Sequence, residues 1–236
     1  MISAKGIIFD YGGTIDTNGI HWAEVIWAEY QRAEAGVSRE LFREAYVHGE
    51  RTLGKNRIIE PTHTFHDLLE IKMKIQFDYL VAQGATHLAV GNKAAEIAEG
   101  CYSRVLETLK TTCHIVEEVS KNHPTVLVTN FYGNMPVVLK EFSLDKYFDT
   151  IVESSVVGLR KPDPRLFALG VEALGLSAED IVVIGDSYRK DIAPARSLGC
   201  KAVWLKKVVW EEEPLEFGKE PTAVIDSLEQ LTGIIG

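Results

Sequence analysis

The amino-acid sequence predicts an α/β fold in which a doubly wound parallel sheet carries an inserted all-helical cap domain. Three observations lead to this prediction. Short apolar runs bounded by polar turn residues recur along the chain, amphipathic helical patterns alternate with them, and residues 18–108 show long helical patterns with few strand-like runs. Strands that alternate with helices at this spacing are typical of a parallel sheet with helices on both faces.

Four apolar runs are expected to form strands of the sheet. They are residues 6–9, 125–128, 181–184 and 202–205. Three helical patterns accompany the later runs, each with apolar residues three or four positions apart. They are residues 137–142, 164–174 and 191–198. The core domain is therefore predicted to comprise residues 1–17 and 109–236.

The block between these core segments, residues 18–108, is expected to be the helical cap domain. Its amphipathic stretches are residues 21–35, 39–48, 66–83 and 93–109. Ser38 is an expected helix start, because a serine hydroxyl can cap the first turn of a helix. Breaks between the helices are expected at Gly36, Gly54, Pro61 and Gly84.

Composition limits the classes of function that the chain can have. It has 236 residues, of which 46% are hydrophobic, and a formal net charge of −9 at pH 7. This acidic balance disfavours a nucleic-acid or an anionic-membrane partner, and no run approaches the roughly 18 apolar residues of a membrane span. The scattered Cys101, Cys113 and Cys200 indicate reduced thiols and a cytoplasmic protein. The acidic run at residues 211–213 is expected to be a solvated loop.

The most informative stretch is residues 10–16, Asp-Tyr-Gly-Gly-Thr-Ile-Asp, which directly follows the first apolar run. The run and the two glycines indicate a buried strand that ends in a tight turn. Ligands of open α/β sheets bind just beyond the carboxyl ends of the strands. Asp10 is therefore a candidate nucleophile or metal ligand.

Further polar side chains are expected at the same edge of the sheet. They are Thr129 and Asn130 after the second run, Lys161 before the helix at residue 164, and Asp186 and Asp191 after the third run. Three aspartates around one point would repel strongly, and a hard divalent cation such as Mg²⁺ removes that repulsion. The threonine and the lysine suit the charged oxygens of a phosphoryl group.

Taken in this order, the motifs resemble those of the haloacid dehalogenase superfamily. The similarity rests on the strand-end aspartate turn at Asp10, on Thr129, on Lys161, and on the Gly-Asp-Ser sequence around Asp186 with Asp191 five residues beyond. It covers the whole chain, because the helical block stands where members of the superfamily carry a cap after the first motif.

The resemblance implies a Mg²⁺-dependent hydrolase acting on a small phosphorylated metabolite, with the oligomeric state left open. Asp10 would attack phosphorus and form an aspartyl-phosphate. The metal would be held by the Asp10 carboxylate, the backbone carbonyl of Gly12, Asp186 and Asp191. The phosphate would be bound by Thr129, Asn130, Lys161 and Gly13, and Thr14 would stabilise the turn.

One position departs from the superfamily's phosphatases. They carry an aspartate two residues after the nucleophile, which protonates the leaving oxygen and then activates water, whereas this chain has Gly12. The glycine can offer its carbonyl to a metal, but it cannot transfer a proton. General acid–base catalysis contributes about 10²–10⁴-fold, so alkyl phosphates should react slowly unless another group supplies the acid.

The first hypothesis is accordingly a phosphatase with a different acid, supplied by Asp16, by the substrate or by the cap. The cap candidates are His48, His63 and His66.

Two other hypotheses stay open. Phosphonoacetaldehyde hydrolases carry an aromatic and a small residue after the nucleophile, as Tyr11 and Gly12 do here, and cleave a carbon–phosphorus bond through an imine on a cap lysine. Lys55 is the candidate for that lysine. The third hypothesis is a catalytically weak or non-enzymatic binding protein. Dehalogenation is disfavoured, because that reaction needs no metal and the chain retains Asp186 and Asp191.

Overall fold

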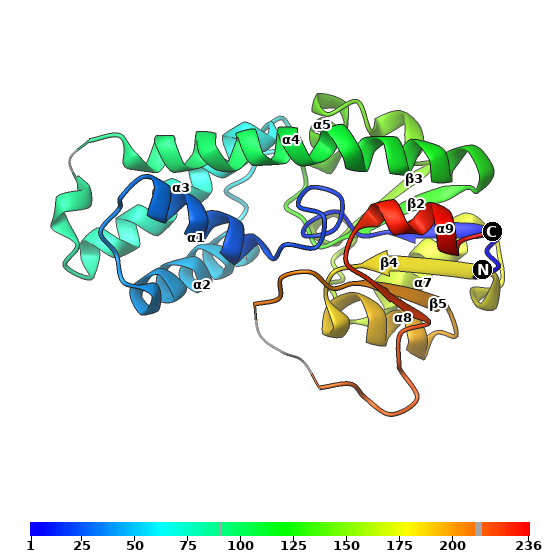
Figure 1. Ribbon diagram of the computed structural model, residues 1–236. Coiled ribbons are helices and arrows are strands. Elements are labelled where there is room, and N and C mark those ends of the chain that lie inside the picture. The colour runs from blue at the N-terminus through cyan, green and yellow to red at the C-terminus, as the bar shows by residue number, and fades with distance from the viewer. Residues whose placement is uncertain (90, 211–213) are drawn as a thin grey trace.

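The protein is described by a computed structural model that covers residues 1–89, 91–210 and 214–236. Its centre is a six-stranded sheet in the order β3-β2-β1-β4-β5-β6, with every neighbouring pair parallel (Figure 1). The strands are β1 (Gly6–Phe9), β2 (Thr125–Thr129), β3 (Thr150–Glu153), β4 (Ile181–Gly185), β5 (Lys201–Leu205) and β6 (Ala223–Ile225). The strand order reverses between β1 and β4, and such a switch point is where α/β sheets bind ligands.

The apolar runs predict the four inner strands and miss β3 and β6, which lie at the two edges of the sheet. β3 buries two of its four residues, and β6 has three residues of which only Ile225 is buried. Edge strands pack on fewer neighbours, so their sequences need less continuous apolar character. The pattern that identifies a central strand is therefore absent from them.

Side chains of each strand alternate between two covered faces. Ile7 and Phe9 of β1 belong to the hydrophobic core on one face, and Ile8 belongs to the core on the other. The first face is covered by α4 (Lys93–Asn122), α5 (Met135–Glu141) and α9 (Leu231–Ile234), and the second by α7 (Pro164–Leu174) and α8 (Ala193–Ser197). Helices on both faces confirm the doubly wound α/β class.

Shorter elements complete the core. The helix α6 (Ser154–Val157) follows β3, and 3₁₀ turns lie at Asp145–Tyr147, Ala178–Asp180 and Leu228–Gln230. The helix expected over residues 191–198 is shorter, because a π-helical turn at Tyr188–Ile192 precedes α8. Single π-turns occur frequently at functional sites.

The inserted block is helical, as predicted. It contains α1 (Trp22–Arg32), α2 (Arg39–Lys55), α3 (Phe65–Ala82), a 3₁₀ turn at Thr86–Ala89 and the first part of α4. Ser38 caps α2, and its hydroxyl accepts a hydrogen bond from the backbone N–H of Leu41 at 3.2 Å. The break expected at Gly54 is wrong, because α2 continues to Lys55 and an exposed last turn tolerates glycine at modest cost.

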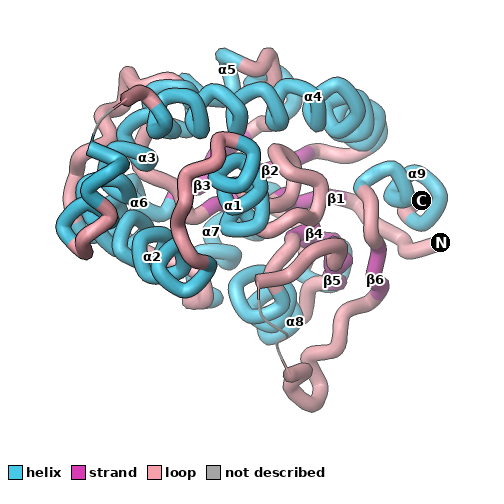
Figure 2. Tube along the Cα trace, turned by 60° about the vertical axis from the view of Figure 1, so that its left-hand side comes forward, coloured by secondary structure: helices cyan, strands magenta, loops and turns pink. Residues whose placement is uncertain are grey.

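One long helix connects the cap to the core. The pattern predicts a helix over residues 93–109, but α4 continues to Asn122 and packs its C-terminal part on the sheet (Figures 1 and 2). The boundary predicted between residues 108 and 109 therefore falls inside a helix, and the division into two domains stays a prediction. The cap lies beyond the carboxyl ends of the strands (Figure 1).

Three further expectations concern membrane spans, the cysteines and the acidic run. In the described ranges, no helix is both long and apolar enough to cross a membrane. All three cysteines are free thiols, and Cys101 and Cys200 are buried. The acidic run at residues 211–213 lies outside the described residues.

Candidate active site

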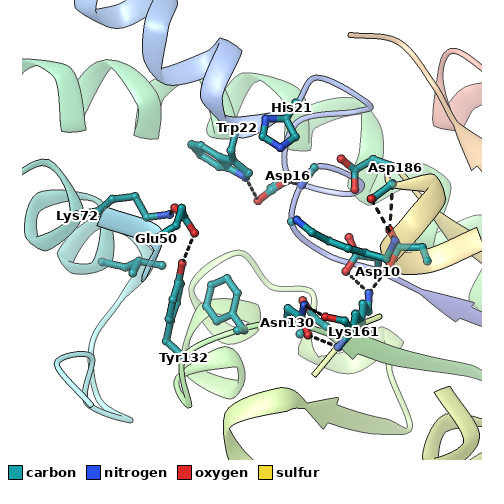
Figure 3. A pocket seen from close by; sticks show the side chains of 18 of the residues that line it. Asp10, Asp16, His21, Trp22, Glu50, Lys72, Asn130, Tyr132, Lys161 and Asp186 are labelled. Carbon is teal, nitrogen blue, oxygen red and sulfur yellow. Dashed lines mark hydrogen bonds and ion pairs between the residues drawn. The ribbon is translucent and has the colours of Figure 1, made fainter. Parts of the chain in front are cut away.

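A cavity of about 130 Å³ lies between the carboxyl end of the sheet and the cap (Figure 3). Its core side is formed by every residue that the sequence predicts for the site: Asp10, Gly12, Gly13, Thr129, Asn130, Lys161, Asp186 and Asp191. Its cap side includes Trp22, Glu50, Phe65 and Lys72. The strand ends thus bring together residues that are up to 181 positions apart in the chain.

Asp10 is held at the end of β1 through its backbone N–H and both of its carboxylate oxygens. Its backbone N–H donates to the carbonyl of Ile184 at 2.9 Å, which ties the turn to β4. Its Oδ1 accepts from Lys161 Nζ at 2.6 Å, and its Oδ2 accepts from the Thr14 hydroxyl at 3.0 Å. Burial raises the pKa of Asp10 to about 6, although the Lys161 ammonium opposes the shift. A group positioned in this way is oriented for attack on a bound ligand.

Lys161 is the fixed cation of the site. Its Nζ lies 2.6 Å from Asp10 Oδ1 and 2.6 Å from Asp191 Oδ1, and its side chain is 2% exposed. Burial lowers the pKa of Lys161, but the two carboxylates outweigh that effect and raise it above the ordinary lysine value. The lysine is therefore a fixed positive charge beside Asp10.

Asn130 holds the backbone of this lysine. Its Oδ1 accepts from the Lys161 N–H at 2.9 Å, and its Nδ2 donates to the Lys161 carbonyl at 3.2 Å. The side-chain amide of Asn130 thus acts both as an acceptor and as a donor. The side chain predicted to bind phosphate therefore acts in this structure as a brace for Lys161.

The three aspartates meet around one point. Oxygens of Asp10, Asp186 and Asp191 lie within 4.8 Å of one another. The π-turn directs Asp191 inward, because its N–H donates to the Ser187 carbonyl at 2.9 Å while its Oδ2 accepts from the Ser187 N–H at 3.1 Å. Burial and the neighbouring carboxylates raise the pKa of Asp186 well above its usual range.

Hard carboxylate oxygens at this spacing are the donors that Mg²⁺ prefers. A bound dication would also relieve the repulsion that raises the pKa of Asp186. The residues present therefore fit a magnesium site made by Asp10, Asp186 and Asp191.

The turn after β1 requires glycine at one of its two glycine positions. Gly13 has φ +93°, and a Cβ there would stand 2.3 Å from Asp186 Oδ2. Gly12 differs, because its φ lies outside the left-handed region and no heavy atom lies within 4 Å of the position a Cβ would take. Position 12 thus has room for a side chain on the wall of the cavity.

Asp16 links this turn to the cap. Its Oδ1 accepts from the Gly13 N–H at 2.7 Å, and its Oδ2 accepts from Trp22 Nε1, at the start of α1, at 2.9 Å. Burial raises the pKa of Asp16 to about 7, although these two hydrogen bonds oppose the shift. Asp16 lines the cavity, so the structure keeps it among the groups able to exchange a proton there.

The cap residues proposed from sequence do not reach the site. Among the described residues, the lining of the cavity includes neither Lys55 nor His48, His63 or His66. Lys55 is exposed at the end of α2. The candidate lysine of the cavity is instead Lys72, on the buried side of α3.

Sequence reasoning misses three groups on the cap side: Lys72, Glu50 and Tyr132. Lys72 Nζ lies 2.7 Å from Glu50 Oε1, and the Tyr132 hydroxyl donates to Glu50 Oε2 at 3.0 Å (Figure 3). A signal for Lys72 exists in the sequence, because it stands four residues after Leu68 and therefore on the apolar face of its helix. Nothing in the sequence indicates its partner.

His21 also faces the cavity. Its Nδ1 accepts from the Ala23 N–H at 3.1 Å as the cap of α1, and its ring stacks on Trp210 with centroids 5.6 Å apart. Burial lowers the pKa of His21 to about 4. The ring is therefore neutral near pH 7 and is a poor proton reservoir in that range.

A family model of hydrolases, haloacid dehalogenase-like hydrolase, matches residues 4–199. The chain is 32% identical over 92 residues to the glyceraldehyde 3-phosphate phosphatase of Pyrococcus furiosus and 38% identical over 71 residues to the phosphoserine phosphatase of Thermus thermophilus. It is 27% identical over 128 residues to the phosphoglycolate phosphatase of Salmonella typhi. These alignments cover 39%, 30% and 52% of this chain, and 38%, 28% and 50% of the relatives, so they span half or less of the relatives' own length.

Three solved structures share the fold over nearly the whole chain. The HAD-hydrolase YfnB from Bacillus subtilis, bound to magnesium, has a TM-score of 0.59 at 16% identity and covers 98% of both chains. The L-2-haloacid dehalogenase of Xanthobacter autotrophicus has a TM-score of 0.58 at 13% identity and covers 98% of both chains. A HAD phosphatase from Thermococcus onnurineus has a TM-score of 0.52 at 20% identity and covers 98% of this chain and 97% of its own. At these identities the similarity concerns the fold.

Proposed function

This chain belongs to the haloacid dehalogenase-like hydrolases, and from that premise we propose that it is a magnesium-dependent phosphatase of a small phosphorylated metabolite. The observation that carries the proposal is the buried Lys161 ammonium between Asp10 and Asp191, with Asp186 completing the acidic group. A nucleophilic carboxylate, a fixed cation and a metal-ligating set at one strand edge are the parts that phosphoryl transfer needs.

In the proposed reaction, a carboxylate oxygen of Asp10 attacks phosphorus. The bond from phosphorus to the ester oxygen breaks, the leaving oxygen takes a proton from Asp16, and an aspartyl-phosphate remains. Water then gives a proton back to Asp16 and attacks this phosphorus, which releases inorganic phosphate and restores the Asp10 carboxylate. Lys161 neutralises charge on the non-bridging oxygens, and the Thr129 hydroxyl at the end of β2 donates to one of them.

Mg²⁺ bound by Asp10, Asp186, Asp191 and the Gly12 carbonyl would neutralise charge on the phosphoryl oxygens and the carboxylates together. Two residues of the chain hold Lys161 and Asp10 in position. Asn130 keeps Lys161 in place, and Thr14 orients Asp10. Apolar cap residues, Trp22, Phe65, Leu68 and Leu69, line the same cavity and would limit the access of water to a bound ester.

The lack of an acid at Gly12 decides which esters should react fastest. A leaving group that departs without a proton avoids the missing step, whereas an alkoxide does not. Asp16 is the proton-exchanging group that we favour as a substitute, because it lines the cavity and its pKa of about 7 leaves it partly protonated at neutral pH.

Carbon–phosphorus cleavage is the less supported alternative. An imine-forming lysine must lose its proton, which requires a lowered pKa. Lys72, the lysine that α3 of the cap contributes to the cavity, has instead a raised pKa, because Glu50 outweighs the effect of burial. The observations therefore favour ester hydrolysis over imine chemistry.

The decisive experiment is Mg²⁺-dependent turnover of p-nitrophenyl phosphate by the wild type and by Asp10→Asn. This leaving group needs little protonation, so the assay does not depend on an acid at position 12. We expect turnover that requires Mg²⁺ and disappears in Asp10→Asn. Asp145→Asn, at an exposed position of the core, is the matched control and should keep wild-type turnover.

Two outcomes would redirect the proposal. Turnover equal to that of Asp10→Asn would refute the phosphatase and favour a binding protein. Loss of activity when borohydride is added together with phosphonoacetaldehyde would indicate an imine and support carbon–phosphorus cleavage.

A further inference from the structure

The cap presents a partly buried ion pair to the cavity that the proposed chemistry does not use. Lys72 Nζ on α3 lies 2.7 Å from Glu50 Oε1 on α2, and the two side chains are 9% and 30% exposed. The Tyr132 hydroxyl donates to the second oxygen of Glu50 at 3.0 Å. Glu50 raises the pKa of Lys72 and Lys72 lowers the pKa of Glu50, although burial opposes both shifts. The pair is thus fully charged at neutral pH.

This pair faces the place that a leaving group would occupy. Glu50, Lys72 and Tyr132 line the same cavity as Asp10 and Lys161, and they lie on its opposite side (Figure 3). If the phosphoryl group lies against Asp10 and Lys161 on the core side of the cavity, the rest of the ester points toward the pair. A subsite for the leaving group is therefore built from two cap helices and the loop after β2.

The charges of the pair decide which leaving groups it accepts. Lys72 Nζ lies 2.7 Å from Glu50 Oε1. A ligand ammonium that approaches Glu50 therefore also approaches the Lys72 ammonium, and a ligand carboxylate that approaches Lys72 also approaches the Glu50 carboxylate. Either ion is attracted by one partner and repelled by the other. Uncharged hydroxyls avoid this conflict, because one can donate to Glu50 while its neighbour accepts from Lys72.

The apolar walls support the same selection. Trp22, Phe65, Leu68 and Leu69 line the cavity beside the pair, and they would pack on the carbon chain of a ligand. Lys72 Nζ lies 6.0 Å from the centre of the Trp22 ring, so the polar and apolar surfaces adjoin. This is the pattern of a few placed polar groups in an apolar pocket.

We propose that Glu50, Lys72 and Tyr132 are the specificity-determining residues of this active site, and that they select a small uncharged leaving group with neighbouring hydroxyls. The substrate class is a polyol or sugar phosphate. The proposal rests on the proposed phosphatase function and refines its substrate.

The test compares kcat/KM for three esters that differ in the charge of the leaving group. They are glycerol 3-phosphate with a neutral diol, phosphoglycolate with a carboxylate, and phosphoserine with a zwitterion. We expect the wild type to prefer glycerol 3-phosphate at least tenfold over the other two. Glu50→Gln removes the repulsion of carboxylates and leaves the Lys72 cation, so the ratio of phosphoglycolate to glycerol 3-phosphate should rise at least tenfold.

Two further variants keep the test decisive. Glu44→Gln on the same helix is exposed and outside the cavity, and it should leave the ratio at its wild-type value. If Glu50→Gln does not fold, Tyr132→Phe replaces it. That change removes only the hydroxyl that orients Glu50, and the preference for glycerol 3-phosphate should fall several-fold.

The outcomes separate this inference from the proposed function. A wild type that hydrolyses none of the esters, p-nitrophenyl phosphate included, refutes the phosphatase itself. A wild type that hydrolyses p-nitrophenyl phosphate but prefers phosphoglycolate or phosphoserine refutes the inference alone. An unchanged ratio in a folded Glu50→Gln or Tyr132→Phe protein refutes it as well.

Discussion

Restoring a carboxylate at position 12 is the sharpest perturbation that the structure suggests. No heavy atom lies within 4 Å of the position a Cβ would take at Gly12, and the backbone there suits any L-residue. Gly12→Asp therefore places its Cβ on the cavity wall without a clash. The backbone carbonyl at position 12, which is a proposed metal ligand, is retained.

The expected gain follows from general acid catalysis. A well-placed acid contributes about 10²–10⁴-fold, which corresponds to about 3–5 kcal/mol of the barrier. Two carboxylates about 5 Å apart repel by about 3 kcal/mol at an effective dielectric constant of about 20. Oxygens of Asp10, Asp186 and Asp191 already lie within 4.8 Å of one another, so a fourth carboxylate beside them should have a raised pKa and be able to donate a proton near neutrality.

The assay is the ratio of kcat/KM for glycerol 3-phosphate to that for p-nitrophenyl phosphate. Only the first leaving group needs a proton, so Gly12→Asp should raise the ratio by about 10²-fold or more. Gly12→Asn has the same shape and cannot donate a carboxylic proton, which makes it the matched control. Asp16 is expected to be only a partial substitute for the missing acid. Equal ratios in the two variants would refute this expectation and indicate that Asp16 already supplies the proton at full efficiency.

Three other predictions concern the supports of the site. The folded pKa of Asp16, about 7, is above its ordinary value of 3.8, so the free energy of unfolding should fall relative to Asp16→Asn by about 3 kcal/mol as pH rises from about 4 to 7; a pH-independent difference in denaturant unfolding would contradict this. Gly13→Ala places a Cβ against the Asp186 carboxylate at positive φ, and it should cost about 1–3 kcal/mol of stability, measured by thermal unfolding, whereas an unchanged midpoint would show that the turn relaxes freely. Asn130→Ala removes both hydrogen bonds to the Lys161 backbone, and kcat should fall about tenfold or more through misplacement of the lysine; a change in KM alone would indicate a role in binding only.

The sequence determined the four inner strands of the sheet and the residues of the core half of the site. Runs such as residues 181–184 are apolar throughout because both faces of a parallel sheet are covered. Once the strands are known to be parallel, their carboxyl ends must meet at one edge. Asp10, Thr129 and Asp186 directly follow or end the predicted strands β1, β2 and β4, so their convergence could be expected from the order of the strands alone, whereas Lys161 follows α6 and was placed by the fold.

Local sequence was less informative wherever a residue's role depends on its neighbour. Asn130 lies where the sequence predicts a phosphate ligand, yet its side-chain amide hydrogen-bonds to the Lys161 backbone. Lys55 has the position of a cap lysine along the chain, yet it ends a helix in solvent. The residues next to a side chain in the sequence do not reveal which residue it contacts in the folded protein.

The cap half of the site was decided only by tertiary structure. Helical periodicity tells which face of α2 or α3 is buried, and it predicts that Glu50 or Lys72 must find a partner if it lies there. It does not tell which helix lies opposite, since crossing angles and loop lengths set that pairing. The ion pair and its Tyr132 support exist because two cap helices and a core loop close over one cavity, and they face Asp10 because α4 and Trp22 tie the cap to the end of the sheet.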